Sequence, residues 1–474
     1  MKPPSLLRSK FFWVGILYFA QGFPFGVFYD VLPVYFRSHH VNLEEIGFLA
    51  LFGLSWTIKF LWAPAIDYFR HHRRWMFGVN VLMAAVMLIL AFHTEINAGL
   101  WAAIGCFTLL SATNDIAIDG YTVELFDRKE LGRANGLRIA FWRVGVLGAG
   151  GLLMLQPWIG WSGVYMGAAV ILVFSGCVCL TAPPERARPE TGLVAPVTEL
   201  RTLFKRPLIL LSALLVVGGL LAGGLKHPTW ALAMLAAGII LGIAERRRGI
   251  GVTPGPMLGA FLEMTERPNF LLVVGFILLY KLADTTGGFM VKPFMVDAHL
   301  TPAEIGLVSV NLGLILSILG GIAGGWITDR IGIFKGLWVL GIAQALPNLG
   351  YAALAFWLPI HAPGFSPDAL QRGLIYAVSG TESFAQGLGT AAFLSLLMAI
   401  IDKRRSATEY AVLSSIFALS RSVAGWAGGF GAQSLGYGPF FVMTFFLAIP
   451  AYFLLPWVKK MLAYAETQTA WHQH

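Results

Sequence analysis

Two aspartates stand four residues apart in an otherwise apolar segment, "SATNDIAIDGYTVELF" (111–126). On a helix this spacing is a rotation of about 40°, so Asp115 and Asp119 share one face. A carboxyl group that is shielded from water and lies near a second one can hold a proton at neutral pH and release it on exposure. We therefore expect Asp115 and Asp119 to carry protons. The alternative, favoured more for Asp119 because it lies nearer the segment's end, is an ion pair with Arg73, Arg74 or Arg138.

A second set of ionisable residues lies in apolar segments of the C-terminal half. Lys281 and Asp284 are three residues apart, so they can pair on one helical face. They either contact a ligand and carry a proton or neutralise each other structurally. Glu382 has no cation at helical spacing, and we expect it to carry a proton. Gln386, four residues later, shares its face and is a candidate for binding the ligand.

Further polar residues inside apolar segments are candidates for ligand binding. Arg143 and Arg421 occupy corresponding places in two similar stretches, 141–151 and 419–429. A guanidinium group can hold a carboxylate or phosphate through two parallel hydrogen bonds, although both arginines could instead pair with the buried acids. The remaining candidates are single polar residues. Lys59 either contacts the ligand or pairs with a buried acid, Asp30 either binds the ligand or snorkels towards water, and Gln21 is a further ligand candidate.

The composition places these residues in a membrane. Hydrophobic residues make up 57% of the chain and charged residues 12%, whereas soluble proteins contain roughly 25% charged residues. The formal charge of +9 comes from basic residues in short loops, which is a topology signal and not a nucleic-acid-binding surface. The three cysteines lie in apolar runs, so we expect neither disulfides nor metal binding. These features predict an all-α polytopic membrane protein.

Apolar runs long enough to cross a bilayer recur along the whole chain. We predict fourteen spans, at about 11–36, 46–66, 75–93, 98–124, 133–155, 161–182, 208–226, 229–245, 268–296, 304–327, 334–357, 370–400, 406–432 and 437–458. Basic clusters such as "RHHRR" (70–74) and "DKRR" (402–405) then fall on the side of the N-terminus. The positive-inside rule therefore predicts that both termini are cytoplasmic.

The chain also repeats itself weakly. "EIGFLALFGL" (45–54) is similar to "EIGLVSVNLGL" (304–314), and "FWRVGVLGAGG" (141–151) is similar to "LSRSVAGWAGG" (419–429). Equivalent positions in two six-helix halves with the same orientation predict a parallel repeat. We divide the chain into a first half (1–182), a linker with two extra helices (183–267), a second half (268–460) and a cytoplasmic tail (461–474).

This organisation resembles the major facilitator superfamily. The segment "GWITDRIGIFK" (325–335) resembles that family's G-x-x-x-D-R-x-G loop, and "APAIDYFRHHRR" (63–74) is a weaker counterpart in the first half. The resemblance implies gating or structural roles, not ligand contact, for Asp67, Asp329 and Arg330. It also implies two halves that surround a central cavity.

Within that superfamily the chain resembles the AmpG-type muropeptide permeases. The resemblance rests on segments such as "NDIAIDGYTVEL" (114–125), "LYKLADTTGG" (279–288) and "GLGTAAFLSLLMAIIDKRRSATEYAVLSS" (387–415). It implies a proton-coupled importer that moves an anhydro-muropeptide from periplasm to cytoplasm, as a monomer in the bacterial inner membrane. Because "FYDVLPVYFRSHH" (28–40) departs from the family pattern, a siderophore or another drug-like or acyl-CoA-like solute is the alternative ligand.

Other functional classes are weakly supported by the sequence. The apolar segments contain neither a metal-ligand spacing of His, Asp and Glu nor a paired Ser and His, so we expect neither an enzyme, a metal site nor a cofactor. The chain lacks a G-x-x-x-x-G-K-[ST] motif, which argues against direct driving by ATP. A receptor without transport would not need ionisable residues in both halves.

Overall fold

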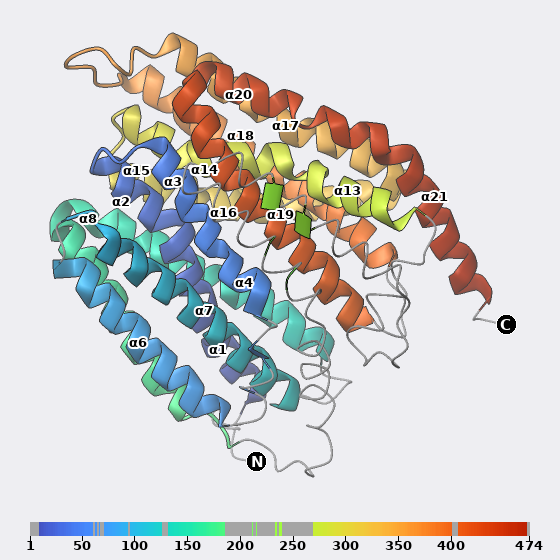
Figure 1. The fold of residues 1–474 in the computed structure, drawn as a ribbon, viewed down its shortest axis with the longest axis horizontal. Helices are drawn as coiled ribbons and strands as arrows, with labels where there is room; N and C mark the ends of the chain where they lie inside the picture. The colour runs from blue at the N-terminus through green and yellow to red at the C-terminus, as the bar shows by residue number, and fades with distance from the viewer. Residues whose placement is uncertain are drawn as a thin grey trace, which may run out of the picture.

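The computed structural model describes residues 9–59, 62–63, 66, 71–92, 95–125, 131–184, 211, 215, 233–234, 237–238, 269–400 and 406–471. All regular elements within the described residues are helices (Figure 1). Most of the predicted linker and of its two extra spans lies outside this part of the chain, as does Asp67.

The first group of helices begins with one continuous stretch that changes its helical type in the middle. This stretch contains α1 (Lys10–Gly26), the π-helix η2 (Val27–Val31) and α2 (Leu32–Ser38). The group continues with α3 (Leu43–Leu49), the 3-10 helix η3 (Ala50–Gly53), α4 (Leu54–Ile58), α6 (His72–Phe92), α7 (Ala98–Leu125) and α8 (Leu131–Leu180). Gly160 interrupts α8 with a φ of 66°, and it lies between the two spans predicted for that segment.

The second group follows the same order of segments. It contains α13 (Phe270–Tyr280), α14 (Leu282–Asp297), α15 (Pro302–Ile305), the π-helix η6 (Gly306–Leu312), α16 (Gly313–Ile331), α17 (Ile333–Trp357), α18 (Ala369–Ala399), α19 (Ser406–Leu435), α20 (Tyr437–Phe446) and α21 (Ile449–Trp471). Capping boxes at Thr301 and Asp368 fix where α15 and α18 begin, because each side chain accepts a hydrogen bond from a backbone N–H of the first turn.

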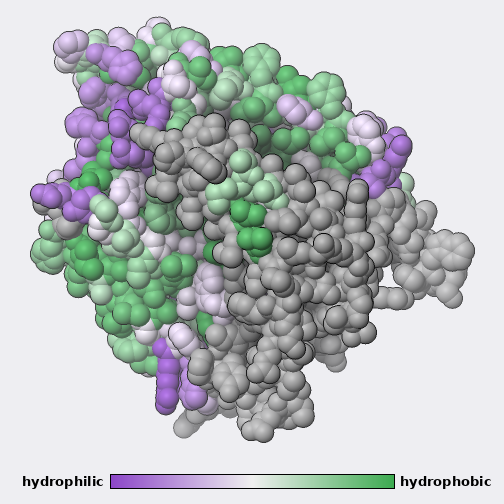
Figure 2. All heavy atoms as spheres, viewed as in Figure 1, coloured by the Kyte–Doolittle hydropathy of each residue, from purple (hydrophilic) through white to green (hydrophobic). Residues whose placement is uncertain are grey.

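The outer surface of these helices suits a bilayer. Eight helices among the described residues are long and apolar enough to cross a membrane. Large apolar side chains such as Phe92, Trp158 and Phe453 are more than 70% exposed, which a soluble protein avoids. Figure 2 shows hydrophobic side chains over much of the described face and hydrophilic ones gathered towards its ends. The chain is therefore a multi-pass membrane protein.

The repeated segments form the contacts between the two groups. On α3, a Cβ atom added to Gly47 would lie 2.7 Å from the Cα atom of Gly429 on α19. On η6, a Cβ atom added to Gly306 would lie 2.8 Å from the carbonyl oxygen of Gly150 on α8. Small residues allow two helix backbones to approach this closely. In each of the two helix crossings, a segment of one similar pair therefore packs against a segment of the other pair.

Polar contacts between the groups gather at one end of the molecule, which we call the tied end. Arg37 of α2 binds Asp297 of α14 there, and the Leu43 backbone N–H donates to Gln433 of α19. At the opposite end, where α1 and α13 begin, the two groups diverge (Figure 1). The molecule is therefore held together at one end and spread at the other.

Candidate functional site

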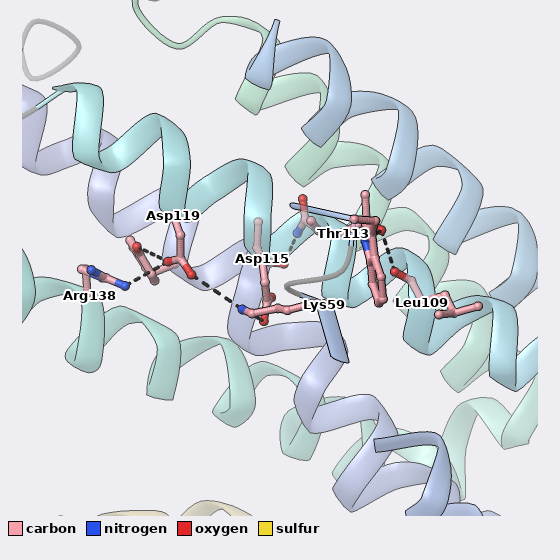
Figure 3. A network of polar contacts seen from close by, with 10 residues as sticks. Lys59, Leu109, Thr113, Asp115, Asp119 and Arg138 are labelled. Atoms are coloured by element: carbon pink, nitrogen blue, oxygen red, sulfur yellow. Dashed lines mark hydrogen bonds and ion pairs between the residues drawn. The ribbon is translucent and has the colours of Figure 1, made fainter. Parts of the chain in front are cut away.

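The first cluster of charges lies between α1, α4, α7 and α8. Lys59, which follows α4, places its Nζ atom 3.4 Å from Asp115 Oδ2 and 3.7 Å from Asp119 Oδ2 (Figure 3). The two aspartates therefore do share one face of α7, as their spacing predicts. The Asp115 side chain is 10% exposed, whereas those of Lys59 and Asp119 are 29% and 35% exposed. One ammonium group is thus shared by two carboxylates at different depths.

Asp119 is held by two further partners. The Tyr18 hydroxyl donates to its Oδ1 atom at 2.7 Å, and Arg138 Nη2 donates to the same atom at 2.9 Å (Figure 3). The Arg138 guanidinium also lies 4.7 Å from the centre of the Tyr18 ring. These contacts connect α1, α7 and α8 through one carboxylate. They match the bracing role that the sequence left open for Asp119.

Asp115 lacks such support. Its Oδ1 atom is buried and accepts no hydrogen bond within the described part of the chain, and the same is true of Gln21 Oε1 on α1. A buried acceptor without a donor is costly. A proton on Asp115 would supply the missing donor and would also remove one of the two carboxylates that pair with Lys59. Asp115 can therefore either bind a proton or form an ion pair with Lys59.

The second cluster lies between α13, α14, α17 and α18. Lys281 is 2% exposed and donates to Asp284 Oδ2 at 3.1 Å, Gln344 Oε1 at 2.9 Å and Thr390 Oγ1 at 2.8 Å. Gln386 Nε2 donates to the other oxygen of Asp284 at 3.3 Å. An ammonium group has three donors, and here all three are used. Lys281 and Asp284 thus neutralise each other, which leaves no Lys281 donor for a ligand in this conformation.

Glu382 of α18 resembles Asp115 in being poorly compensated. Its only hydrogen-bond partner within the described residues is the neighbouring Ser383 hydroxyl, at 3.4 Å. No Lys or Arg in that part of the chain lies within 4.0 Å of its carboxylate. Because a lone carboxylate shielded from water is unfavourable, Glu382 can serve as a second proton-binding group.

The two repeat-related arginines have different surroundings. Arg421 of α19 lies 5.8 Å from the ring centre of Phe25 and 5.7 Å from that of Tyr29. Arg143 of α8 is half-buried. Neither makes an ion pair with an acid of the described residues, so the alternative that they balance Asp115 and Glu382 has no contact to support it here. Both remain candidates for binding an anion.

Asp30 is engaged by the other group of helices. Lys292 of α14 places its Nζ atom 2.9 Å from Asp30 Oδ1, with side-chain exposures of 17% and 15%. Closer to the tied end, Arg37 binds both carboxylate oxygens of Asp297 at 2.6 Å, and the Tyr437 hydroxyl donates to Asp297 at 2.6 Å. Both ion pairs connect the first stretch of one group to the first stretch of the other.

The sequence reasoning missed the pair of Arg37 and Asp297. A signal was present, because these residues end the first predicted span of each half, and a parallel repeat brings such ends to the same side. Asp329 and Arg330, by contrast, are exposed at the end of α16, where Arg330 lies 3.8 Å from the Trp326 ring. Within the described residues, the structure gives neither of them an ion pair.

The part of the chain that the structure describes contains no candidate metal-binding site. No group of three or more His, Cys, Asp and Glu side chains there could hold a metal ion. Cys106, Cys177 and Cys179 are free. The clusters above therefore offer proton binding, ion pairing and hydrogen bonding.

Comparison with known proteins agrees with this geometry. The family model of the Major Facilitator Superfamily matches residues 14–370. An anhydromuropeptide permease of Escherichia coli (strain K12) is 25% identical, over 95% of this chain and 80% of that protein. A putative transporter AmpG 4 of Rickettsia felis is 24% identical, over 95% and 97% of the two chains. The predicted resemblance to AmpG-type permeases is thus confirmed.

Solved structures show the same fold at low sequence identity. An auto-inhibited POT family peptide transporter has a TM-score of 0.66 at 15% identity, covering 95% of this chain and 96% of that one. The nucleoside transporter NupG has a TM-score of 0.60 at 11% identity, covering 95% and 100%. These likenesses concern the fold alone.

Proposed function

Because the chain belongs to the Major Facilitator Superfamily, we propose that this transporter is a proton-coupled importer of anhydro-muropeptides that works by alternating access. The assignment of the ligand rests on the similarity, over 95% of the chain, to relatives named anhydromuropeptide permease. Ionisable side chains inside both groups of helices support the coupling. In a membrane interior such groups are costly unless they serve a pathway or a partner.

The proposed direction is from the periplasm to the cytoplasm. Basic loops on the side of the N-terminus support an inner-membrane topology with fourteen spans and both termini cytoplasmic. In that orientation the tied end faces the periplasm and the diverging end faces the cytoplasm. The structure would then be the inward-facing state, in which the monomer releases its ligand.

The coupling step uses the contrast between Asp115 and Asp119. Asp119 keeps its contacts with Tyr18 and Arg138 and serves as a structural brace. Asp115 takes up a proton when its surroundings open to the periplasm, and Lys59, which then contacts only the Asp119 carboxylate in this cluster, can bind an anionic group of the ligand. When the site opens to the cytoplasm, Asp115 loses the proton and recaptures Lys59, at the 3.4 Å seen here. Ligand and proton then leave together.

Opening towards the periplasm requires that the ties between the groups break. The pair of Arg37 and Asp297 and the pair of Asp30 and Lys292 connect α2 and η2 to α14. Separating the groups at this end separates both pairs. We therefore assign them to the periplasmic gate, and Asp30 binds ligand only after Lys292 has withdrawn. Glu382, which lies within reach of the charge of Lys292, is proposed as the proton-binding group of the second half.

The test is uptake of labelled anhydro-muropeptide by proteoliposomes, with and without an inward proton gradient. We expect the wild type to accumulate ligand only with the gradient. Asp115→Asn should lose gradient-driven uptake but keep exchange of external for internal ligand, because exchange does not require net proton release. Glu95→Gln removes an exposed carboxylate and should behave like the wild type.

Each other outcome removes a specific part of the proposal. Accumulation retained by Asp115→Asn would contradict its coupling role and leave Glu382 as the carrier, which Glu382→Gln would test. Absence of both uptake and exchange in folded wild-type protein would contradict the muropeptide assignment. Uptake of a ferric siderophore in the same vesicles would then establish the alternative ligand.

A further inference from the structure

Three aromatic side chains of the first group surround Phe25, which lies five residues before Asp30. The ring centre of Phe25 lies 4.4 Å from that of Tyr29, 5.6 Å from that of Trp56 and 4.9 Å from that of Trp142. Phe25 and Tyr29 come from the continuous stretch of α1 and η2, whereas Trp56 comes from α4 and Trp142 from α8. We call these four residues the aromatic cluster.

The aromatic cluster differs from the hydrophobic core beside it. Phe23 and Phe28 are fully buried at 0% exposure, whereas all four residues of the aromatic cluster are only half-buried. Two of the four rings, Phe25 and Tyr29, contact the other group of helices. Phe289 of α14 lies 6.4 Å from Tyr29, and Arg421 of α19 lies beside Phe25. The cluster therefore borders the second group through Phe25 and Tyr29, and each of its four rings keeps part of its surface uncovered.

A cation accompanies these rings. The Arg421 guanidinium lies beside Phe25, Tyr29 and Phe417 at 5.4–5.8 Å. It has no carboxylate within ion-pair distance among the described residues. Aromatic rings stabilise a cation only modestly compared with a carboxylate. A ligand with an anionic group near an aromatic-binding face would complete this arrangement.

The backbone that carries Tyr29 is irregular. Residues Val27–Val31 form the π-helix η2 in the middle of an otherwise α-helical stretch. Such turns rotate the side chains that follow and occur often at functional sites. Tyr29 is placed against Gly53 and near the Ser422 hydroxyl of the second group, since a Cβ atom on Gly53 would lie 2.4 Å from Tyr29 Oη. The ring is thus positioned between the groups and is not free to retreat into the core.

We propose that Phe25, Trp56 and Trp142 form a saccharide subsite and that Arg421 binds a carboxylate of the same ligand. The proposal rests on the proposed function and deepens it, by assigning the sugar end of the ligand to the aromatic cluster and its peptide end to the side of Lys59. One face of a pyranose ring carries C–H bonds with a slight positive charge, which matches the negative face of an aromatic ring. The arginine supplies two parallel donors for a carboxylate.

The experiment compares two probes by equilibrium binding to the purified full-length protein. One probe is an anhydro-muropeptide, and the other is the free stem peptide that lacks the saccharide. We expect Trp56→Leu and Trp142→Leu each to weaken muropeptide binding about tenfold, the loss expected for one aromatic contact. Binding of the free peptide should not change. Trp158→Leu is the matched control, because Trp158 lies on the same helix as Trp142 but is 77% exposed on the outer surface.

Arg421 is tested separately with the carboxylates of the muropeptide amidated one at a time. Arg421→Gln should reduce affinity for the unmodified probe about tenfold and should abolish its preference over one amidated form. Equal weakening of both probes by Trp56→Leu and Trp142→Leu, or no weakening, overturns the saccharide subsite while the proposed function stands. Wild-type protein that binds neither probe overturns the proposed function and, with it, this subsite.

Discussion

The ion pair between Arg37 and Asp297 is expected to hold the tied end closed, and Arg37→Ala should open it. The pair has two charged hydrogen bonds of 2.6 Å, and its side chains are 19% and 16% exposed. A hydrogen bond between charged groups contributes about 1.5–3 kcal/mol, and partial exposure to solvent keeps the two bonds of this pair from adding in full. We therefore assign about 2–3 kcal/mol to the tie. Its loss should shift the equilibrium towards opening at this end by about 30- to 150-fold.

The assay is the distance between spin labels on either side of the tied end. Cysteines at the exposed positions His40 and His361 would carry the labels, after the three native cysteines are replaced by serine. Wild-type protein should give one short distance. Arg37→Ala should add a longer distance as the major population, and the exchanged pair Arg37→Asp with Asp297→Arg should restore the short one.

A matched control separates the tie from a general loss of charge. Arg372 makes an ion pair with Glu304, which joins two helices of the same group and does not cross between the groups. Arg372→Ala should therefore leave the distance distribution unchanged. The reasoning is refuted if Arg37→Ala also leaves it unchanged, or if both variants lengthen the distance equally.

Two further predictions concern packing. Lys281→Met should destabilise the protein by about 3–5 kcal/mol, because it leaves the buried carboxylate of Asp284 without its cation. Adding Asp284→Leu should recover most of that loss. Heat unfolding in detergent measures the stability of both variants, and equal stabilities of the single and double variants would contradict the prediction. Gly47→Ala should push α3 away from Gly429, since its Cβ atom would lie 2.7 Å from that residue's Cα atom, and should lengthen the same spin-label distance. Gly78→Ala, where a Cβ atom meets nothing within 4 Å, should have no effect, and a shift there as large as at Gly47 would argue against the glycine contact.

Much of the local structure could be predicted from the sequence because it depends on short-range rules. A bilayer core requires about 20 apolar helical residues per crossing, so most helices among the described residues begin and end close to the predicted spans. The exception is α21, which continues to Trp471, through most of the segment predicted to be a tail. Helical spacing alone placed Asp115 and Asp119 on one face, and it paired Lys281 with Asp284. The similar segments contain the glycines through which the two groups meet, although the sequence did not predict that contact.

The partners of these residues could not be predicted in the same way. The contact of Lys59 with both aspartates depends on how α4 meets α7. Asp30, expected to bind ligand, is instead held by Lys292 in this conformation. Helical periodicity says which face a side chain occupies, but it carries no information on which face of another helix lies opposite.

The sequence by itself determined the class of protein, most of the long apolar helices, the similar segments of the two halves and the ionisable residues within apolar segments, because each follows from composition and local spacing. Only the tertiary structure decided which charges are satisfied and which are not. It joined Arg37 to Asp297 across 260 positions of sequence, saturated Lys281, left one oxygen of Asp115 without a donor from the described residues, and gathered the aromatic cluster. The physical reason is that charge compensation depends on how the helices pack. Packing can bring two residues into contact however far apart they lie along the chain.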